Sequence, residues 1–163
     1  MPAVVLTLGD DISTDVIYPG RYMATVLPSE TPQFAFADIA GFNARLTSGD
    51  IPQGSVIAAG KNFGCGSSRE QAVSTLKGYD LTIVAESFAR IFLQNAINLG
   101  LNLITAPGFE AAEGDDVEAV GEVIHNRTSG KQFAVIPLPK ARQAILDAGG
   151  LISYTRKRLL KTL

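Results

Sequence analysis

Short apolar runs, separated by glycine, proline and acidic residues, mark the first two thirds of the chain. Apolar runs of four to five residues between turn signals are typical of strands that are buried on both faces. Runs of this kind occupy residues 3–7, 55–59, 81–85 and 101–105. Apolar positions at helical spacing predict helices over 34–42, 69–77 and 88–99. The alternation of strand, loop and helix predicts an α/β core in which neighbouring strands are parallel.

The pattern changes after residue 109. Alternating short runs predict antiparallel edge strands over 115–120, 122–124 and 133–136, with a hairpin turn at 126–130. A helix over 139–148 is expected to stop at two glycines. The basic tail that follows is expected to fray or to rest on a partner. Because no internal repeat or low-complexity linker interrupts the chain, we expect a single domain over 1–163.

Composition narrows the classes of function. The 163 residues are 46% hydrophobic, and 14 basic against 16 acidic side chains leave a net charge of −2, which gives no field to attract nucleic acid. No apolar run approaches the ~20 residues that cross a bilayer, and the acidic start does not fit a secretory signal. A single cysteine, Cys65, excludes a disulfide framework and any self-sufficient thiolate site for zinc or an iron–sulfur cluster. An unpaired cysteine suits the reducing cytoplasm.

The most informative stretch is the glycine–serine loop 64–70, which reads Gly-Cys-Gly-Ser-Ser-Arg-Glu. It connects a predicted strand to a helix start, so backbone N–H groups would gather at the positive end of a helix dipole and form an anion site. Arg69 would oppose that dipole unless it binds a carboxylate or phosphate held there. Two adjacent hydroxyl groups, on Ser67 and Ser68, would add a donor and a proton acceptor.

A purely structural interpretation competes with the anion site. Ser67 or Ser68 could cap the helix, with Glu70 completing a capping box, but capping leaves the Gly-x-Gly pattern and Arg69 unexplained. The loop lacks the ending of a P-loop and the third glycine of a dinucleotide fingerprint. A catalytic pair of Cys65 with His125, the only histidine, is disfavoured because His125 falls in the expected hairpin region, as an exposed residue beside the turn.

A second polar stretch covers residues 9–22, where Asp10, Asp11, Ser13, Thr14 and Asp15 lie beside turn signals. Such side chains could hold calcium or magnesium, but the spacing does not match an EF-hand. Because Asp, Ser and Thr are also ordinary turn residues, the turn interpretation is favoured.

Four blocks in order resemble one family. They are GDDISTD with PGRY in residues 9–22, GKNFGCGSSRE in 60–70, AESFARIF in 85–92 and NAINLG in 95–100. Together they resemble the small subunits of 3-isopropylmalate dehydratases, which belong to the aconitase superfamily. The resemblance implies a three-layer β/β/α swivel fold. It also implies a cytoplasmic hydro-lyase of leucine biosynthesis that isomerises 2-isopropylmalate and 3-isopropylmalate by dehydration and rehydration.

The resemblance also implies a division of labour between two proteins. A separate large subunit would hold the 4Fe–4S cluster, and this chain would hold no cofactor or metal and bring its loop to the substrate, a small hydroxy acid. Ser67 would be the catalytic base, as an alkoxide that takes a proton from carbon, and Asp15 would support the catalytic histidine of the large subunit. Ser68 and Arg69 would bind substrate carboxylates. Without the large subunit, the chain could form a homo-oligomer.

In the family, the segment after an Arg-Tyr pair reads the substrate's variable group. By resemblance, Arg21, Tyr22, Ala24 and Thr25 would contact the substrate. The segment is Tyr22-Met23-Ala24-Thr25 here, and Ala24 stands where an arginine would bind an additional carboxylate. The segment therefore favours an apolar substituent. It matches no single form of the family, so a homoaconitase-like or methylated-malate dehydratase subunit remains an alternative. So does an anion-binding module without catalytic activity.

Overall fold

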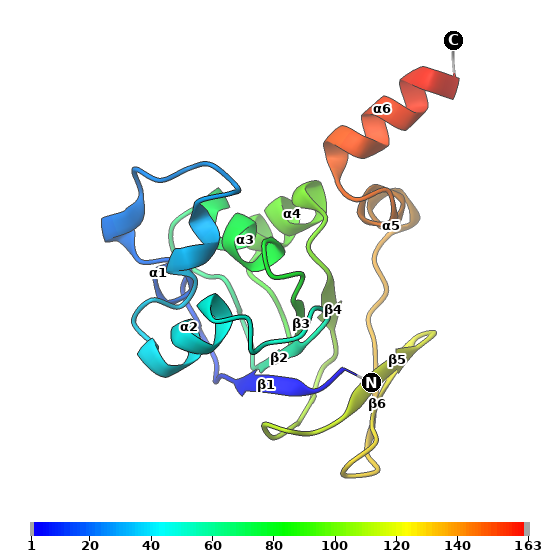
Figure 1. Cartoon of the computed structure of the whole chain (residues 1–163). Helices are drawn as coiled ribbons and strands as arrows, with labels where there is room; N and C mark the ends of the chain where they lie inside the picture. Colours follow the sequence, from blue (N-terminus) through cyan, green and yellow to red (C-terminus); the bar gives the residue numbers. More distant parts are fainter. Residues whose placement is uncertain (1, 162–163) are drawn as a thin grey trace.

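The computed structural model describes residues 2–161. Figure 1 shows a sheet with helices α1 to α4 on one face, short strands on the other, and helices α5 and α6 leading to the C-terminal end. The elements in chain order are β1 (Val4–Thr7), α1 (Thr14–Ile17), η1 (Gly20–Tyr22), η2 (Thr31–Phe34), α2 (Ala40–Thr47), β2 (Val56–Ala59), α3 (Glu70–Lys77), β3 (Thr82–Ala85), α4 (Arg90–Leu99), β4 (Leu103–Thr105), β5 (Val117–Val120), β6 (Val123–Asn126), β7 (Gln132–Ala134), α5 (Lys140–Asp147) and α6 (Leu151–Lys161).

The larger sheet has the order β1-β2-β3-β4, and all its pairs are parallel, as the apolar runs predicted. The carboxyl ends of parallel strands meet at one edge, where ligands of α/β proteins commonly bind. Parallel bridges between Ser13 and Cys65 and between Phe63 and Phe88 join the segments that follow β1, β2 and β3. Segments that are far apart in the sequence are thereby held side by side at this edge.

The two faces of this sheet bury different neighbours, because successive strand residues point to opposite faces. Ile57 and Ile83 belong to the core shared with the helices. Val56 and Val84 pack with Ile124 of β6 in a second core. The layers are therefore sheet, sheet and helices, which confirms the predicted β/β/α arrangement.

The second sheet is antiparallel, in the order β5-β6-β7. Its hairpin turn closes where the sequence predicted it, with the Asn126 N–H donating to the Lys131 carbonyl and the Gly130 N–H donating to the Asn126 carbonyl. The Asn126 side chain is buried, and its Oδ1 accepts from the backbone N–H groups of Thr128 and Ser129. This asparagine fixes the turn from inside the second core.

The helix predicted over 34–42 is wrong. The chain instead forms η2, turns at Phe36 with φ of 50°, and begins α2 at Ala40. The Phe36 ring is fully buried, and its backbone N–H donates to the Ile17 carbonyl. Tertiary burial of this ring therefore overrides a local helical spacing of apolar residues.

The expectation that the tail frays is also wrong, because the last eleven described residues form α6. A Cβ on Gly150 would lie 2.5 Å from the Asn98 carbonyl oxygen, so two glycines let the chain pass close to the end of α4. None of the α6 residues is buried, and Leu151, Ile152 and Leu160 are exposed. Contact of this helix with a partner stays a prediction.

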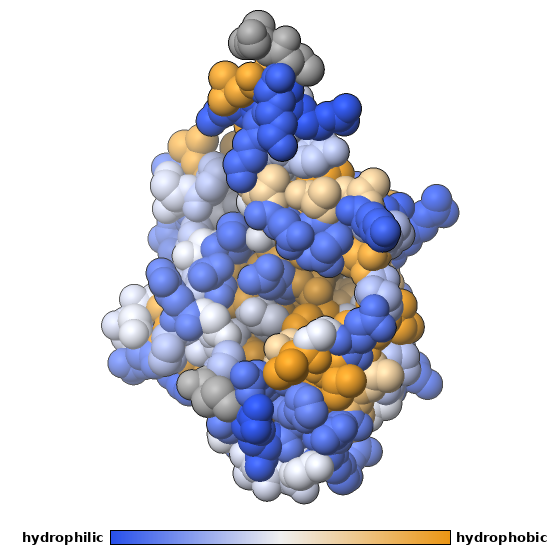
Figure 2. Space-filling model, turned by 90° about the vertical axis from the view of Figure 1, so that its right-hand side faces the viewer, coloured by the Kyte–Doolittle hydropathy of each residue, from blue (hydrophilic) through white to orange (hydrophobic). Residues whose placement is uncertain are grey.

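A cleft of about 320 Å³ lies between β4, the second sheet and α5. Figure 2 shows this side of the molecule, where apolar side chains gather at the surface. Val120 and Ile136 are among the exposed apolar residues. Within residues 2–161, no helix combines the length and the apolar character needed to span a membrane.

Candidate functional site

The glycine–serine loop leaves the carboxyl end of β2 and reaches the start of α3. Two of its glycines have positive φ angles, 84° at Gly64 and 92° at Gly66, a region that residues with a Cβ rarely adopt. A Cβ on Gly64 would also lie 2.2 Å from Cγ of Phe92, so this glycine lets the loop lie directly against α4. The two glycines thus allow the sharp backbone turns of the loop and its close packing against α4 at the start of α3.

Helix α1 holds the loop from the other side. The Thr14 N–H donates to the Cys65 carbonyl at 2.8 Å, and Thr14 Oγ1 donates to the Ser67 carbonyl at 2.9 Å. Thr14 is 3% exposed, so these bonds are protected from water. These bonds fix the backbone of the loop. They do not involve the side chains of Ser67 and Ser68.

Both serines are exposed, and within residues 2–161 neither hydroxyl group makes a hydrogen bond. The capping interpretation is wrong, since Arg69 itself is the N-cap residue of α3 and no side chain caps this end. Arg69 accordingly precedes the first turn in extended conformation, with φ of −106° and ψ of 107°. The N–H groups that begin α3 are free of side-chain caps, as an anion site requires.

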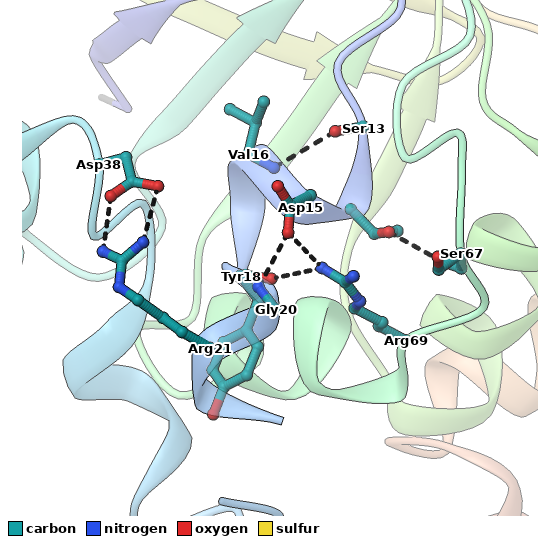
Figure 3. A network of polar contacts seen from close by, with 10 residues as sticks. Ser13, Asp15, Val16, Tyr18, Gly20, Arg21, Asp38, Ser67 and Arg69 are labelled. Carbon is teal, nitrogen blue, oxygen red and sulfur yellow. Dashed lines mark hydrogen bonds and ion pairs between the residues drawn. The ribbon is translucent and has the colours of Figure 1, made fainter. Parts of the chain in front are cut away.

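Arg69 reaches back to α1 and its following turn (Figure 3). Its Nη1 donates to Asp15 Oδ1 at 2.7 Å and to the Tyr18 carbonyl at 3.1 Å. The same carboxylate oxygen accepts from the Gly20 N–H at 2.8 Å. The Arg69 side chain is only 15% exposed, and its Nε is buried without a partner among the described residues. The pair orients the guanidinium group and leaves part of its donor capacity unused.

The pKa of Asp15 lies below its ordinary value because Arg69 donates to the carboxylate and the Gly20 N–H adds a second bond. The carboxylate is exposed, so this pair is weakly stabilising. A lowered folded-state pKa contributes stability above the unfolded-state value of about 3.9, and that contribution is lost as the pH falls through the folded-state pKa.

We therefore expect Asp15→Asn to be less stable than the wild type at neutral pH, with the difference closing in acid as wild-type Asp15 is protonated. Urea unfolding from neutral pH to about pH 3 measures this difference. Asp50→Asn, a change at an exposed carboxylate on another turn, is the matched control. A difference that stays constant across this range would show that the ion pair does not stabilise the fold.

Arg21, the first residue of the segment predicted to read the substrate's variable group, points away from Arg69 and toward Asp38 (Figure 3). Arg21 makes a two-point ion pair with Asp38, at 2.6 and 3.1 Å. The Tyr22 ring stacks on Phe34 at 4.0 Å between centroids. Ala24 is exposed, and the Thr25 carbonyl accepts from the Tyr18 hydroxyl. None of these four residues lines the cleft at the loop, although the segment reaches α3 where Gln71 Nε2 donates to the Met23 carbonyl. Their contact with substrate stays a prediction.

A cleft of about 260 Å³ opens directly at the loop. Its lining residues are Thr14, Gly64, Gly66, Ser67, Ser68 and Arg69 on one side, and Ala89, Arg90, Ile91, Phe92 and Asn95 of the α4 region on the other. The volume is slightly below the ~300–1,000 Å³ of sites for drug-sized ligands, so it suits a small acid.

The other candidate groups do not assemble. Cys65 is unpaired and half-buried in the loop, whereas His125 is half-buried in β6 between Glu118 and Gln132. The two residues belong to different layers, which agrees with the sequence analysis in disfavouring a catalytic pair of Cys65 with His125. His125 lies beside the turn, as predicted, but it is half-buried and not exposed.

The acidic residues of the 9–22 stretch bind the segment that follows β2. Asp10 accepts from the Lys61 N–H, and Asp11 accepts from the Asn62 side chain. Within residues 2–161, no three His, Cys, Asp or Glu side chains lie so as to hold a metal ion. Within this stretch, the Ser13 hydroxyl acts as a local turn residue, since it accepts from the Val16 N–H and caps α1. The bonds of Asp10 and Asp11 instead join the segments that follow β1 and β2.

Sequence reasoning missed the side of the cleft formed by α4. Arg90 and Asn95 were assigned no role, although Arg90 stands in the first turn of a helix that follows a buried strand. The argument that singled out Arg69, a cation opposing a helix dipole, applies to Arg90 as well.

Comparisons with known proteins extend these observations. A family model described as the aconitase C-terminal domain matches residues 34–107. The 3-isopropylmalate dehydratase small subunit of Methanosarcina mazei is 41% identical, over 91% of this chain and 92% of the relative. The isopropylmalate/citramalate isomerase small subunit of Methanocaldococcus jannaschii is 42% identical, over 97% and 95%. A crystal structure described as 3-isopropylmalate dehydratase from Methanocaldococcus jannaschii superposes with a TM-score of 0.88 at 40% identity, covering 98% of this chain and 95% of that chain.

Proposed function

The chain belongs to the family of 3-isopropylmalate dehydratase small subunits, and on this basis we propose that it is the small subunit of a hydro-lyase that interconverts 2-isopropylmalate and 3-isopropylmalate in leucine biosynthesis. The observation that carries the proposal is the loop at the 260 Å³ cleft, where the hydroxyl groups of Ser67 and Ser68 are free beside Arg69. Dehydration of a hydroxy acid needs a base at carbon and positive charge at the carboxylates. The loop offers both.

Ser67 is the base in this proposal. As an alkoxide it takes the proton from the carbon next to the one that loses the hydroxyl group, and it returns a proton during rehydration. The uncapped N–H groups at the start of α3 and the guanidinium of Arg69 supply positive potential beside the Ser67 hydroxyl, which favours its alkoxide form. The hydrogen bond from Thr14 to the Ser67 carbonyl fixes the backbone without occupying the hydroxyl group.

Ser68 and Arg69 bind a substrate carboxylate. Nη1 of Arg69 is held by Asp15 and Nε is buried, so Nη2, which makes no hydrogen bond within residues 2–161, remains for a ligand. Both bonds to the Asp15 carboxylate use Oδ1. Its Oδ2 is then open to the catalytic histidine that the large subunit would supply.

An aconitase-family dehydratase implies an iron–sulfur cluster in the enzyme. The residues of this chain do not fit a 4Fe–4S cluster, which needs several thiolates, because the sequence has one cysteine. We therefore place the cluster in the large subunit and derive no step through it here.

A second candidate substrate is citramalate, the 2-methyl analogue. It is favoured by the Methanocaldococcus jannaschii relative, whose name couples isopropylmalate with citramalate. Ala24 adds neither charge nor bulk to its segment, which is compatible with either alkyl group and disfavours a third carboxylate of the homoaconitase type.

The test is reconstitution with a cluster-loaded large subunit. We expect the purified chain alone to be colourless and inactive, because it cannot hold the cluster, and turnover to appear on mixing. Visible absorbance and the ultraviolet absorbance of the unsaturated acid measure these two properties. The large subunit alone is the control, and 2-isopropylmalate and citramalate are compared by kcat/KM. Turnover by this chain alone would overturn the subunit assignment, and an inactive mixture with both acids would overturn the function.

A further inference from the structure

The side of the cleft that faces the glycine–serine loop is the first turn of α4. Ala89, Arg90, Ile91 and Phe92 line it, together with Asn95 one turn further on. Helix α4 begins at Arg90, and its N-cap residue, Ala89, has no side chain that could bind the free N–H groups. The starts of α3 and α4 thus meet at one cleft, and neither has a side-chain cap.

Charge distinguishes the two helix starts. The first turn of α3 contains Glu70, which suits the dipole, whereas that of α4 contains no acidic residue and begins with a cation, Arg90. A cation at this position is unfavourable, because it lies at the positive end of the helix dipole. An anion bound between Arg90 and the N–H groups would reverse this effect.

The two arginines of the cleft also differ in their partners. Arg69 makes an ion pair with Asp15 through Nη1. Arg90 makes no ion pair or hydrogen bond within residues 2–161, and the half-buried side-chain amide of Asn95 likewise makes none there. Of the two arginines that line the cleft, Arg90 is therefore the one without a charged partner among the described residues.

We propose that Arg90 binds one carboxylate of a dicarboxylic substrate, that Asn95 adds a neutral hydrogen bond, and that Ser68 and Arg69 bind the other carboxylate. The inference rests on the proposed function, because isopropylmalate and citramalate both carry two carboxylates. Arg69 alone, with its Nη1 held by Asp15, is poorly suited to bind two separated carboxylates. Arg69 and Arg90, on opposite sides of the cleft, can each bind one. Arg90 thus acts in substrate binding, whereas Ser67 acts in proton transfer.

The test is Arg90→Gln in the complex with the large subunit. Losing a hydrogen bond to a charged group is expected to raise KM about 10- to 100-fold while kcat stays within about threefold, since the interaction is made in the ground state and in the transition state alike. Arg90→Lys should recover part of the loss. Arg142→Gln, a change at an exposed arginine of α5, is the matched control and should leave KM unchanged.

Two further measurements keep the outcomes apart. Titration of the large subunit measures assembly, and an unchanged KM with a higher requirement for large subunit would show that Arg90 is an interface residue and overturn the proposal. Calorimetric titration of the complexes with 2-isopropylmalate measures binding without turnover. If the wild-type complex binds this acid but does not turn it over, the proposed function is wrong. The role of Arg90 is then tested by comparing the affinities of the wild-type and Arg90→Gln complexes for 2-isopropylmalate. Equal affinities of the wild type and Arg90→Gln would overturn the inference in either case.

Discussion

Replacing Ser67 with alanine is expected to lower kcat of the assembled enzyme about 10²- to 10⁴-fold, the usual range for removing a general base, while KM changes little. The reason is chemical, since a base acts in the transition state and the substrate is held by other groups. The Ser67 hydroxyl makes no hydrogen bond within the described residues, and Thr14 binds its carbonyl, which alanine retains. The folded structure should therefore survive the change.

Steady-state kinetics of the reconstituted complex measures this effect, and thermal unfolding of the variant checks the fold. Ser29→Ala, a change at another exposed serine, is the control. If Ser67→Ala kept turnover within a few-fold of the wild type, the base would have to be a different group. A large drop in Tm together with the loss of activity would point to a structural role of the hydroxyl.

The parallel sheet was predictable because its strands are buried on both faces. Such strands read as unbroken apolar runs, as in Ser55–Ala59, where Val56 faces the second sheet and Ile57 faces the helices. The loop was predictable for a related reason, since glycines at positive φ angles stand between a strand and a helix. In both cases, the residue types within the segment itself determine its backbone conformation.

Other features depend on contacts between distant segments, which a spacing pattern does not reveal. Arg69 was expected to meet a ligand at its helix start, but its Nη1 binds Asp15, 54 residues earlier in the chain. Phe36 interrupts an apparently helical pattern because its ring fills the core beneath Ile17. Arg90 could have been found, because a cation in an uncapped first turn is visible in the sequence once the helix is placed.

The ion pair of Arg69 with Asp15 leads to the second large expected effect. Lysine at position 69 could keep one bond to the carboxylate, but it would lose the forked geometry that lets one group bind Asp15, the Tyr18 carbonyl and a ligand together. Each lost hydrogen bond to a charged partner is worth about 1.5–3 kcal/mol, so we expect Arg69→Lys to lower kcat/KM about a hundredfold, with a rise in KM.

Kinetics over a range of substrate concentrations distinguishes the two variants. Arg69→Lys should raise KM, whereas Ser67→Ala should lower kcat and leave KM nearly unchanged. The matched control is Arg127→Lys, which alters an arginine that also makes a two-point ion pair, with Glu118, but lies in the turn after β6 in the other sheet. That exposed pair is worth at most about 1 kcal/mol, and its loss should leave kcat/KM unchanged. If Arg69→Lys behaved like Arg127→Lys, charge alone would suffice at position 69, and the forked contact would have no part in binding the substrate.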